Sequence, residues 1–300
     1  MGLSEHVISE MLGTGLRGGV DLLFTSPPFP LIREKSYGNH EQHAYVRWLA
    51  GYADLFADLL SETGSLVIEI GNAWNKGLPT MSTVPMEALL ELSRAGKFHL
   101  CQEIIWHNTA RLPSPAQWVT VERIRLKDSF SRIWWLSRTP RPLADNRRVL
   151  QPYSKSMLQL LKRQSYNSGK RPSEHVLGAS GFLANRGGAI SASVREEPQQ
   201  DNQAVPGSVL SLANTGHARA LAEYCARHGL KNHPARMPEA LVKFFVEFLT
   251  EPNDLVMDPF AGTNTTGAVA EAAGRRWLSI EADAQYARSG QGRFMPNNGR

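Results

Sequence analysis

The sequence predicts an α/β fold with a doubly wound, mostly parallel sheet, and three observations support this class. Two short apolar runs, 20–25 and 65–71, have the continuous apolar pattern of strands that are covered on both faces. Segments with helical spacing separate successive strands, as the crossovers between parallel strands require. A strand, a glycine-containing turn, a helix and a further strand follow one another over 255–280.

The first half of the chain supplies most of the predicted elements. After a helix over 4–12 and the strand 20–25, a polar loop over 31–40 is typical of a lid that folds over a site. The apolar spacing then predicts an amphipathic helix that begins at Glu41 and ends at Gly64. The remaining predictions for this half are the strand 65–71, a helix over 86–95, a strand over 98–106, and one or two strands over 123–138 with Trp134 and Trp135 buried.

An irregular region divides the chain into three parts. Residues 139–216 have weak periodicity and are rich in Ser, Gly, Asn, Gln and Pro, and so long a loop is usually functional or disordered. Regular structure resumes in helices over 217–228 and 238–248, a strand over 255–260, a helix over 268–273 and a strand over 277–280. The predicted parts are 1–138, 139–216 and 217–300.

Charge and cysteine content narrow the class of protein. Residues 111–171 hold fourteen Lys and Arg against three acids, a net charge of +11, so the remaining residues carry −6 of the total of +5. A basic region on an acidic body is typical of proteins that bind nucleic-acid phosphates, although solvated loops can also be basic. The two cysteines have no disulfide or zinc spacing, and no apolar run reaches the roughly 18 residues of a membrane span. We therefore expect a soluble, cytoplasmic protein with reduced cysteines.

The loop Thr25-Ser26-Pro27-Pro28-Phe29 follows the first strand, where parallel-sheet enzymes place their chemistry. Consecutive prolines fix two φ angles and remove two amide donors, so the carbonyl oxygens of Ser26 and Pro27 become rigid acceptors. Such acceptors beside an aromatic ring suit a planar, amine-bearing ligand. By itself the pentapeptide also fits an ordinary turn at the end of a strand.

The loop over 258–267 lies in the predicted C-terminal βαβ unit. Only Gly262 and Gly267 are glycines, so Thr and Asn side chains would crowd a pyrophosphate, whereas an adenosyl ligand without phosphates remains compatible. Glu281 lies 19 residues after Gly262, close to the spacing of a carboxylate that binds ribose hydroxyls.

Together, Asp-Pro-Phe-Ala-Gly-Thr-Asn-Thr-Thr-Gly at 258–267 and Thr-Ser-Pro-Pro-Phe at 25–29 resemble the two signature motifs of DNA amino-methyltransferases. Their order, with the proline motif first, is similar to that of the permuted beta class. The segments that further resemble cytosine-N4-specific members are 37–43, 112–115, 171–173, 233–236 and 249–252. The resemblance implies a circularly permuted class I S-adenosylmethionine-dependent methyltransferase fold, in which 1–138 is the catalytic half, 139–216 the irregular target-recognition region and 217–300 the cofactor-binding half.

The resemblance also implies roles for individual residues. Ser26, Pro27, Pro28 and Phe29 would hold a target base flipped out of duplex DNA. S-adenosylmethionine would bind Asp258, Pro259, Phe260, Gly262, Thr263, Asn264 and Thr265, with Glu281 on its ribose and His233, Pro234 and Ala235 near its methionine end. The predicted DNA-binding residues are Arg111, Arg123, Arg125, Lys127, Arg147, Arg148, Lys170 and Arg171. No metal is implied, and Trp106, His107 and Asn108 are candidates to line the base pocket.

The residues support methyl transfer to an exocyclic amine, because Ser26 and the Pro27 carbonyl can accept its two hydrogens while Phe29 stacks on the extruded base. Methylation at cytosine C5 is excluded, since Cys101 and Cys225 lie outside the proline loop. Ser26 stands where adenine-N6 enzymes have Asp or Asn, so cytosine N4 is favoured and adenine N6 is the alternative. A catalytically weakened DNA-binding homologue is a further alternative, because the chain reads Met-Gly-Leu-Ser where family members carry a strand ending in Gly-Asp-Ser. A restriction endonuclease that acts on the same site without direct contact is the expected companion.

Overall fold

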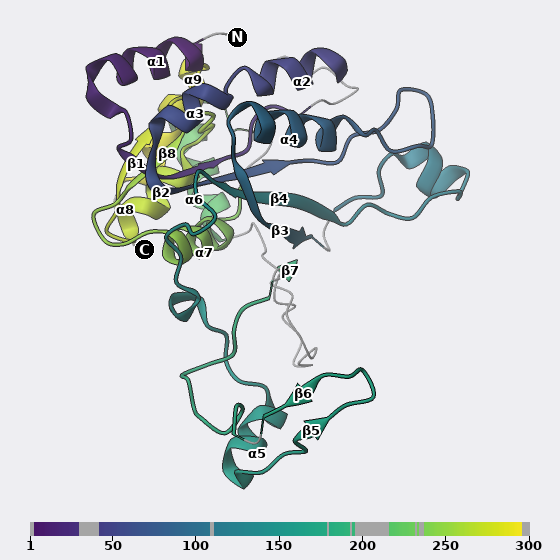
Figure 1. The fold of residues 1–300 in the computed structure, drawn as a ribbon. Helices are drawn as coiled ribbons and strands as arrows, with labels where there is room; N and C mark the ends of the chain where they lie inside the picture. The colour runs from purple at the N-terminus through teal and green to yellow at the C-terminus, as the bar shows by residue number, and fades with distance from the viewer. Residues whose placement is uncertain are drawn as a thin grey trace.

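The computed structural model describes residues 3–29, 42–108, 111–178, 180–192, 194–195, 216–231, 233 and 237–295 (Figure 1). The predicted lid 31–40 lies outside these residues, as do Pro234 and Ala235.

A seven-stranded sheet with the order β7-β3-β4-β2-β1-β8-β9 forms the centre of the molecule. Strand β1 pairs in parallel with β2 and with β8, and β8 pairs in parallel with β9. Within this sheet, only β4 is antiparallel to the other strands. The predicted mostly parallel sheet is therefore confirmed. Its strands are β1 (Val20–Thr25), β2 (Leu60–Ile70), β3 (His99–His107), β4 (Phe130–Ser137), β7 (Val194–Arg195), β8 (Leu255–Asp258) and β9 (Arg276–Ser279).

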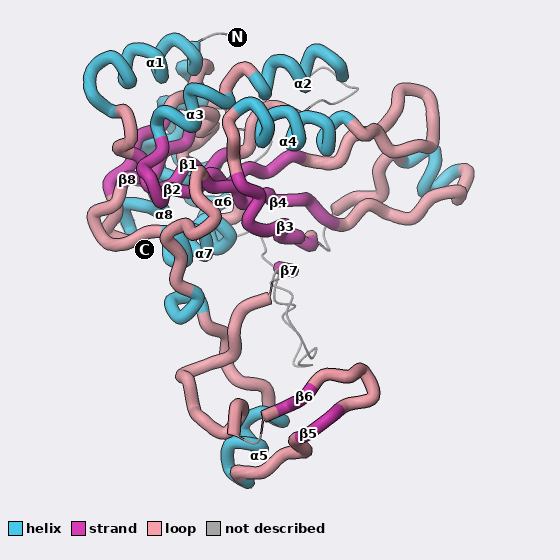
Figure 2. Tube along the Cα trace, in the orientation of Figure 1, coloured by secondary structure: helices cyan, strands magenta, loops and turns pink. Residues whose placement is uncertain are grey.

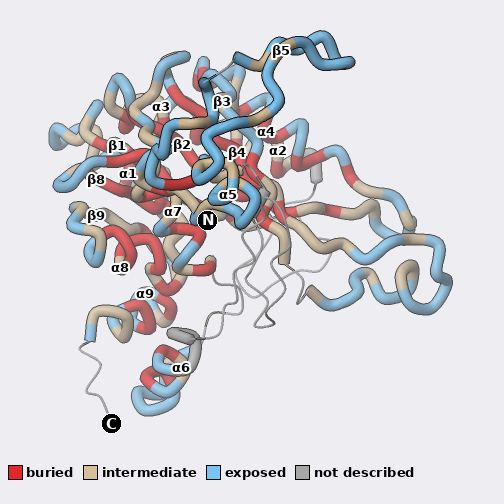
Figure 3. Tube along the Cα trace, turned by 90° about the horizontal axis from the view of Figure 1, so that it is seen from below, coloured by how far each residue is buried: buried red, intermediate tan, exposed pale blue. Residues whose placement is uncertain are grey.

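Helices cover both faces of this sheet, as the continuous apolar strands require. On one face, Leu23 belongs to a core that includes Ile8, Tyr45 and Leu89 from the N-terminal helices. On the other, Leu22 and Phe24 pack with residues of α7 and α8. Figure 3 shows buried segments concentrated in these layers. The helices are α1 (Leu3–Met11), α2 (Gln42–Ala50), α3 (Ala53–Leu59), α4 (Val84–Ala95), α6 (Gly216–His228), α7 (Glu239–Leu249), α8 (Thr265–Ala272) and α9 (Ala284–Gly290).

The single helix predicted from Glu41 to Gly64 is wrong in two respects. The segment forms two helices, α2 and α3, and β2 already begins at Leu60, so Gly64 lies inside a strand. A Cβ atom at Gly64 would lie 2.9 Å from the carbonyl oxygen of Val20 on β1. The glycine therefore permits close approach of two strands, and it is not a helix stop.

Two excursions leave the sheet (Figures 1 and 2). Residues 108–129 join β3 to β4 and contain a short helical turn, η2 (Gln117–Val121), so strand structure is confined to the second part of 123–138. The second excursion, within the predicted irregular region, contains η3 (Asn146–Val149), α5 (Lys155–Arg163) and the small hairpin β5 (Gly169–Lys170) and β6 (Val176–Leu177). No residue of α5 is buried, but Met157, Leu160 and Leu161 are half-buried at helical spacing, so the helix within the predicted irregular region did have a periodic apolar signal.

Candidate active site

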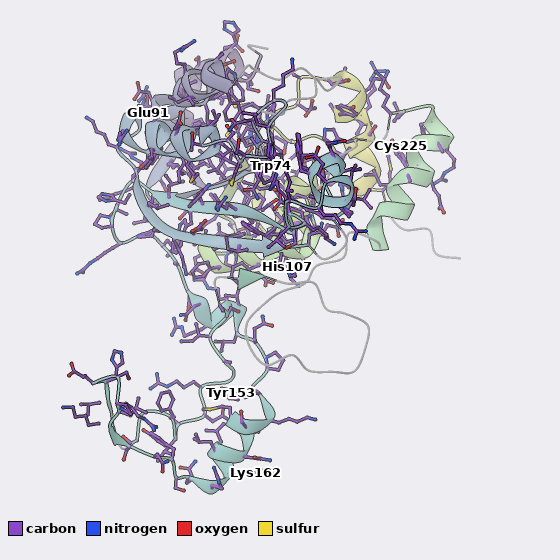
Figure 4. All side chains as sticks on the ribbon, turned by 90° about the vertical axis from the view of Figure 1, so that its right-hand side faces the viewer. Trp74, Glu91, His107, Tyr153, Lys162 and Cys225 are labelled. Atoms are coloured by element: carbon purple, nitrogen blue, oxygen red, sulfur yellow. The ribbon has the colours of Figure 1, made fainter. Side chains whose placement is uncertain are left out.

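The carboxyl ends of β1, β2, β3, β8 and β9 meet at one edge of the sheet, because these strands run in the same direction. The proline loop follows β1, and the loop that begins at Asp258 follows the neighbouring strand β8. Two motifs more than 200 residues apart in sequence are thus adjacent in space. Figure 4 views the molecule from this side, with Trp74 and His107 labelled.

The buried carboxylate of Asp258 joins these two loops. Its Oδ1 accepts a hydrogen bond from the Thr25 hydroxyl at 2.8 Å and another from the Phe260 amide at 3.0 Å. Its Oδ2 accepts from the Thr266 hydroxyl, on α8, at 2.7 Å. Burial raises the pKa of Asp258 to about 6, against these hydrogen bonds, which lower it. The predicted cofactor-binding residue Asp258 therefore holds the shape of the site from within the protein.

Ser26 contacts a second buried carboxylate, which sequence reasoning missed. The Ser26 hydroxyl donates to Oε2 of Glu69 at 2.9 Å. Glu69 belongs to β2, is 6% exposed, and also interacts with Ser131 and Arg111; burial is the main reason that its pKa is raised. Because the Ser26 hydroxyl hydrogen is directed to Glu69, the lone pairs of Oγ are left for other donors. The available signal was an acid inside the otherwise apolar run 66–70.

The aromatic residue of the proline loop rests against the end of β2. A Cβ atom at Gly71 would come within 2.8 Å of the Phe29 ring, so any larger residue at this position would have to displace the ring. Pro27 is buried, while Pro28 and Phe29 are half-buried. The ring is thus held in place while part of its surface remains accessible.

Glu281 bridges the loop after β8 and the loop after β9. Its Oε2 accepts from the Gly262 amide at 2.7 Å and its Oε1 from the Asp283 amide at 2.9 Å. Each oxygen keeps further lone-pair capacity, so these bonds leave room for a ligand hydroxyl. Burial is the largest cause of the raised pKa of Glu281. Gly262 has φ +55°, and its Cα faces the His233 ring, which itself packs on Tyr286 with ring centroids 4.5 Å apart.

The other predicted cofactor-binding side chains divide into two groups. Phe260 is half-buried and packs on Trp48 and Tyr52, with centroids 5.7 and 5.3 Å away. It can present an aromatic face to an adenine. Thr263 and Thr265 are buried, and Asn264 accepts at its Oδ1 from the Gly267 amide, capping α8. These three residues shape the loop. An aromatic face, a half-buried carboxylate and a left-handed glycine together fit an adenosyl group.

The predicted DNA-binding residues lie in three places: the 108–129 excursion, β5 and η3. Arg111 donates to Asp128, the Phe130 carbonyl and Ser131, so its guanidinium supports the Glu69 environment. Arg123, Arg125 and Lys127 lie in the 108–129 excursion, and Lys170 and Arg171 lie at β5. Arg125 stacks over the Trp74 ring at 3.3 Å.

Arg147 and Arg148, by contrast, lie at the opposite, amino edge of the sheet. They belong to η3, where the Asp145 amide donates to the Phe248 carbonyl at the end of α7. Arg148 donates to the Thr250 carbonyl and to Glu251, and Arg147 pairs with Asp145. This position does not favour the predicted role of these two residues in DNA binding.

The described residues also bear on two other kinds of site, metal centres and membrane spans. In this part of the chain, no group of three or more His, Cys, Asp or Glu side chains is arranged to hold a metal ion. Likewise, none of its helices has both the length and the apolar character needed to cross a membrane. Cys101 and Cys225 are free thiols.

Comparisons with known proteins agree with this architecture. The chain is 38% identical over 291 residues to the type II methyltransferase M.PvuII of Proteus hauseri, covering 96% of this chain and 82% of that protein. The solved structure of the cytosine-N4-specific PvuII DNA methyltransferase superposes with a TM-score of 0.67 and 33% identity, covering 97% of this chain and 85% of the other. The complex of M1.HpyAVI with SAM, 16% identical over 97% of this chain and 96% of that chain, has a TM-score of 0.52 and supports the fold alone.

The family model described as DNA methylase matches residues 20–291, which span both loops of the site. With this match and the near full-length similarity to M.PvuII, the chain belongs to the N6/N4 DNA methylase family.

Proposed function

We propose that the protein is a site-specific DNA methyltransferase that transfers a methyl group from S-adenosylmethionine to the N4 amine of a cytosine flipped out of duplex DNA. The observation that supports this most directly is the hydrogen bond from the Ser26 hydroxyl to the buried Glu69. Ser26 follows β1, which pairs with β8, the strand before the adenosyl-type loop. The presence of Ser at position 26, and the cytosine-N4 specificity of the PvuII enzyme, favour cytosine over adenine.

The residues of the proline loop would prepare the amine for attack. Bound S-adenosylmethionine supplies an electrophilic methyl group on a sulfonium. Ser26 Oγ and the Pro27 carbonyl accept the two amine hydrogens, which draws the nitrogen lone pair out of the cytosine ring. Phe260, Gly262 and Glu281 would hold the cofactor, whose sulfur would be the leaving group and would keep the electron pair of the carbon–sulfur bond. The proton that the amine then loses passes to water or, through Ser26, to the carboxylate of Glu69, which burial makes a stronger proton acceptor because it raises the pKa.

Phe29 would keep the extruded base in place. A cytosine that leaves the duplex loses its stacking partners, and a half-buried aromatic ring seated on Gly71 can replace one of them. Stacking of one base on an aromatic side chain contributes about 1–3 kcal/mol.

The expected partners of the protein are DNA and a cognate endonuclease. Arg123, Lys127, Lys170 and Arg171 are the residues that we expect to contact DNA phosphates, since they lie on the two excursions. We infer that the protein is the modification enzyme of a restriction-modification system in a bacterial cytoplasm, where a cognate endonuclease cleaves the same site without contacting it.

The test is methyl transfer from labelled S-adenosylmethionine into duplex DNA, followed by nucleoside analysis. N4-methylcytosine is the expected product, and Ser26→Ala is the control that should abolish it while leaving cofactor binding intact. N6-methyladenine would contradict the assigned base. Retained DNA binding without any transfer would instead identify the catalytically weakened homologue.

A further inference from the structure

An apolar surface occurs on the excursion that leaves the site edge between β3 and β4. Leu112, Val121, Ile124 and Leu126, here called the apolar loop face, are 82%, 68%, 59% and 90% exposed. Four strongly exposed large apolar side chains in one loop exceed the isolated ones that a surface normally carries, and such a concentration is typical of a binding site. Leu126 is the most exposed large hydrophobic residue that the described part of the chain contains.

The loop that carries Leu126 is anchored on both sides of this residue. On one side, the Arg125 guanidinium lies 3.3 Å from the Trp74 ring centroid, and the Arg125 amide donates to the Trp118 carbonyl at 3.2 Å. On the other side, Asp128 accepts from Arg111 at 3.1 Å and from Asn72 at 3.0 Å. The Leu126 side chain is therefore presented to solvent from a fixed backbone.

These anchors connect Leu126 to the proline loop. Arg111, which holds Asp128, also donates to Ser131, and Ser131 hydrogen-bonds Glu69, the partner of Ser26. The exposed leucine thus lies two residues from a hydrogen-bonded network that ends at the proposed base pocket.

The charge of the loop indicates what covers the apolar face. Residues 108–129 contain four Arg and Lys against two acids, Glu122 and Asp128. Because Arg111 pairs with Asp128, three basic residues remain against Glu122. Basic side chains beside exposed leucines complement a nucleic acid, which offers phosphates outside and an apolar base stack inside. A flipped cytosine leaves a gap in that stack, and a branched apolar side chain can fill it.

We propose that Leu126 is a positioning residue that enters the duplex at the gap left by the target base and holds the flipped state open. This inference rests on the proposed function, since it concerns the same substrate. The expected cost of Leu126→Ala is a rate loss of about tenfold on paired DNA, equivalent to ~1.4 kcal/mol of the unstacking energy.

The test compares two duplexes that carry the site mapped in the methylation assay. One has the target cytosine paired with guanine, and the other has it opposite an abasic position, where no base pair must be broken. Leu126→Ala should lose about tenfold in kcat/KM on the paired duplex and about twofold or less on the unpaired one. Leu126→Met should retain the wild-type rates, and Leu90→Ala, at an exposed position on α4, is the matched control.

Three results for Leu126→Ala would overturn the inference. The first is an equal loss of kcat/KM on both duplexes, and the second is no loss on either. The third is conversion of a dimer to a monomer while the ratio of kcat/KM on the two duplexes stays that of the wild type. The last result would assign the apolar loop face to a second copy of the chain. Failure of the wild-type protein to methylate either duplex would instead refute the proposed function.

Discussion

Replacement of Asp258 by Asn tests the central link between the two loops. The protonated carboxyl group and the amide have the same arrangement of one acceptor and one donor atom. The introduced amide can thus accept from Thr25 and from the Phe260 amide at Oδ1, and donate to a rotated Thr266 hydroxyl. Asp258→Asn therefore retains the geometry and removes only the charge.

The magnitude follows from the pKa of Asp258. Burial raises this pKa from 3.8 to about 6, so the folded state binds the proton more tightly than the unfolded chain does. Stability must therefore fall as the pH rises from 3.8 to about 6, because only the unfolded state then ionises readily. A shift of this size corresponds to about 3 kcal/mol. The side chain of Asp258→Asn cannot ionise, so the variant does not lose this stability. Above pH 6 its free energy of unfolding should exceed that of the wild type by up to about 3 kcal/mol, and near pH 3.8 the two proteins should be equally stable.

Urea unfolding followed by tryptophan fluorescence, at pH values from about 4 to about 8, measures the difference in free energy of unfolding. Asp54→Asn, at an exposed position of α3, controls for removal of a carboxylate. A difference between Asp258→Asn and the wild type that stays constant with pH would refute the reasoning, as would a stability advantage of the variant that shrinks as the pH rises.

Three further predictions concern the reaction and DNA binding. Glu69→Gln should lower the methylation rate by about 10²-fold with little change in KM, because Ser26 loses its carboxylate acceptor and the amine proton can no longer pass through Ser26 to Glu69. Stopped-flow or quench kinetics would check this. Phe29→Ala should weaken binding of a duplex with an unpaired target cytosine by about 1–3 kcal/mol, measured by fluorescence anisotropy, while cofactor affinity stays unchanged. Arg148→Glu should lower the free energy of unfolding by about 2 kcal/mol, because it places a second acid beside Glu251. The same change should leave the salt dependence of DNA binding unchanged. Lys170→Glu, by contrast, should make the dependence of log K on log salt shallower by about one unit of slope.

The strands and helices of the core could be predicted because both faces of the sheet are covered. Leu22, Leu23 and Phe24 are all buried, so the strand shows as a continuous apolar run. Local sequence does not specify where the backbone turns within an apolar stretch. The early start of β2 at Leu60 depends on pairing with β1, because Leu60 lies opposite Val20 and Gly64 permits the close approach of the two strands.

The two loops of the site could likewise be located from their motifs, but the roles of single residues could not. Asp258 and Thr265 belong to the cofactor motif, yet both side chains are buried and support the loop from behind. Glu69 carries no motif, because its partnership with Ser26 arises only when β1 and β2 pair. Arg148 was indistinguishable in sequence from a phosphate contact, since its acceptors at Thr250 and Glu251 are about 100 residues away.

The chain between the two halves of the site is fixed to the sheet at several points. The chain leaves the sheet after β4 at the amino edge, where Arg138 donates to the Leu60 carbonyl and the Leu143 amide to that of Thr63. It is held there again by Arg148 at the end of α7. These fixed points lie at the edge opposite Ser26 and Asp258, whereas β7, after the excursion, pairs with Ile105 and Trp106 at the carboxyl end of β3. The second excursion therefore connects the two edges of the sheet. Because β1 and β8 pair directly, the geometry of the site is a property of the sheet and not of the order in which its halves are synthesised.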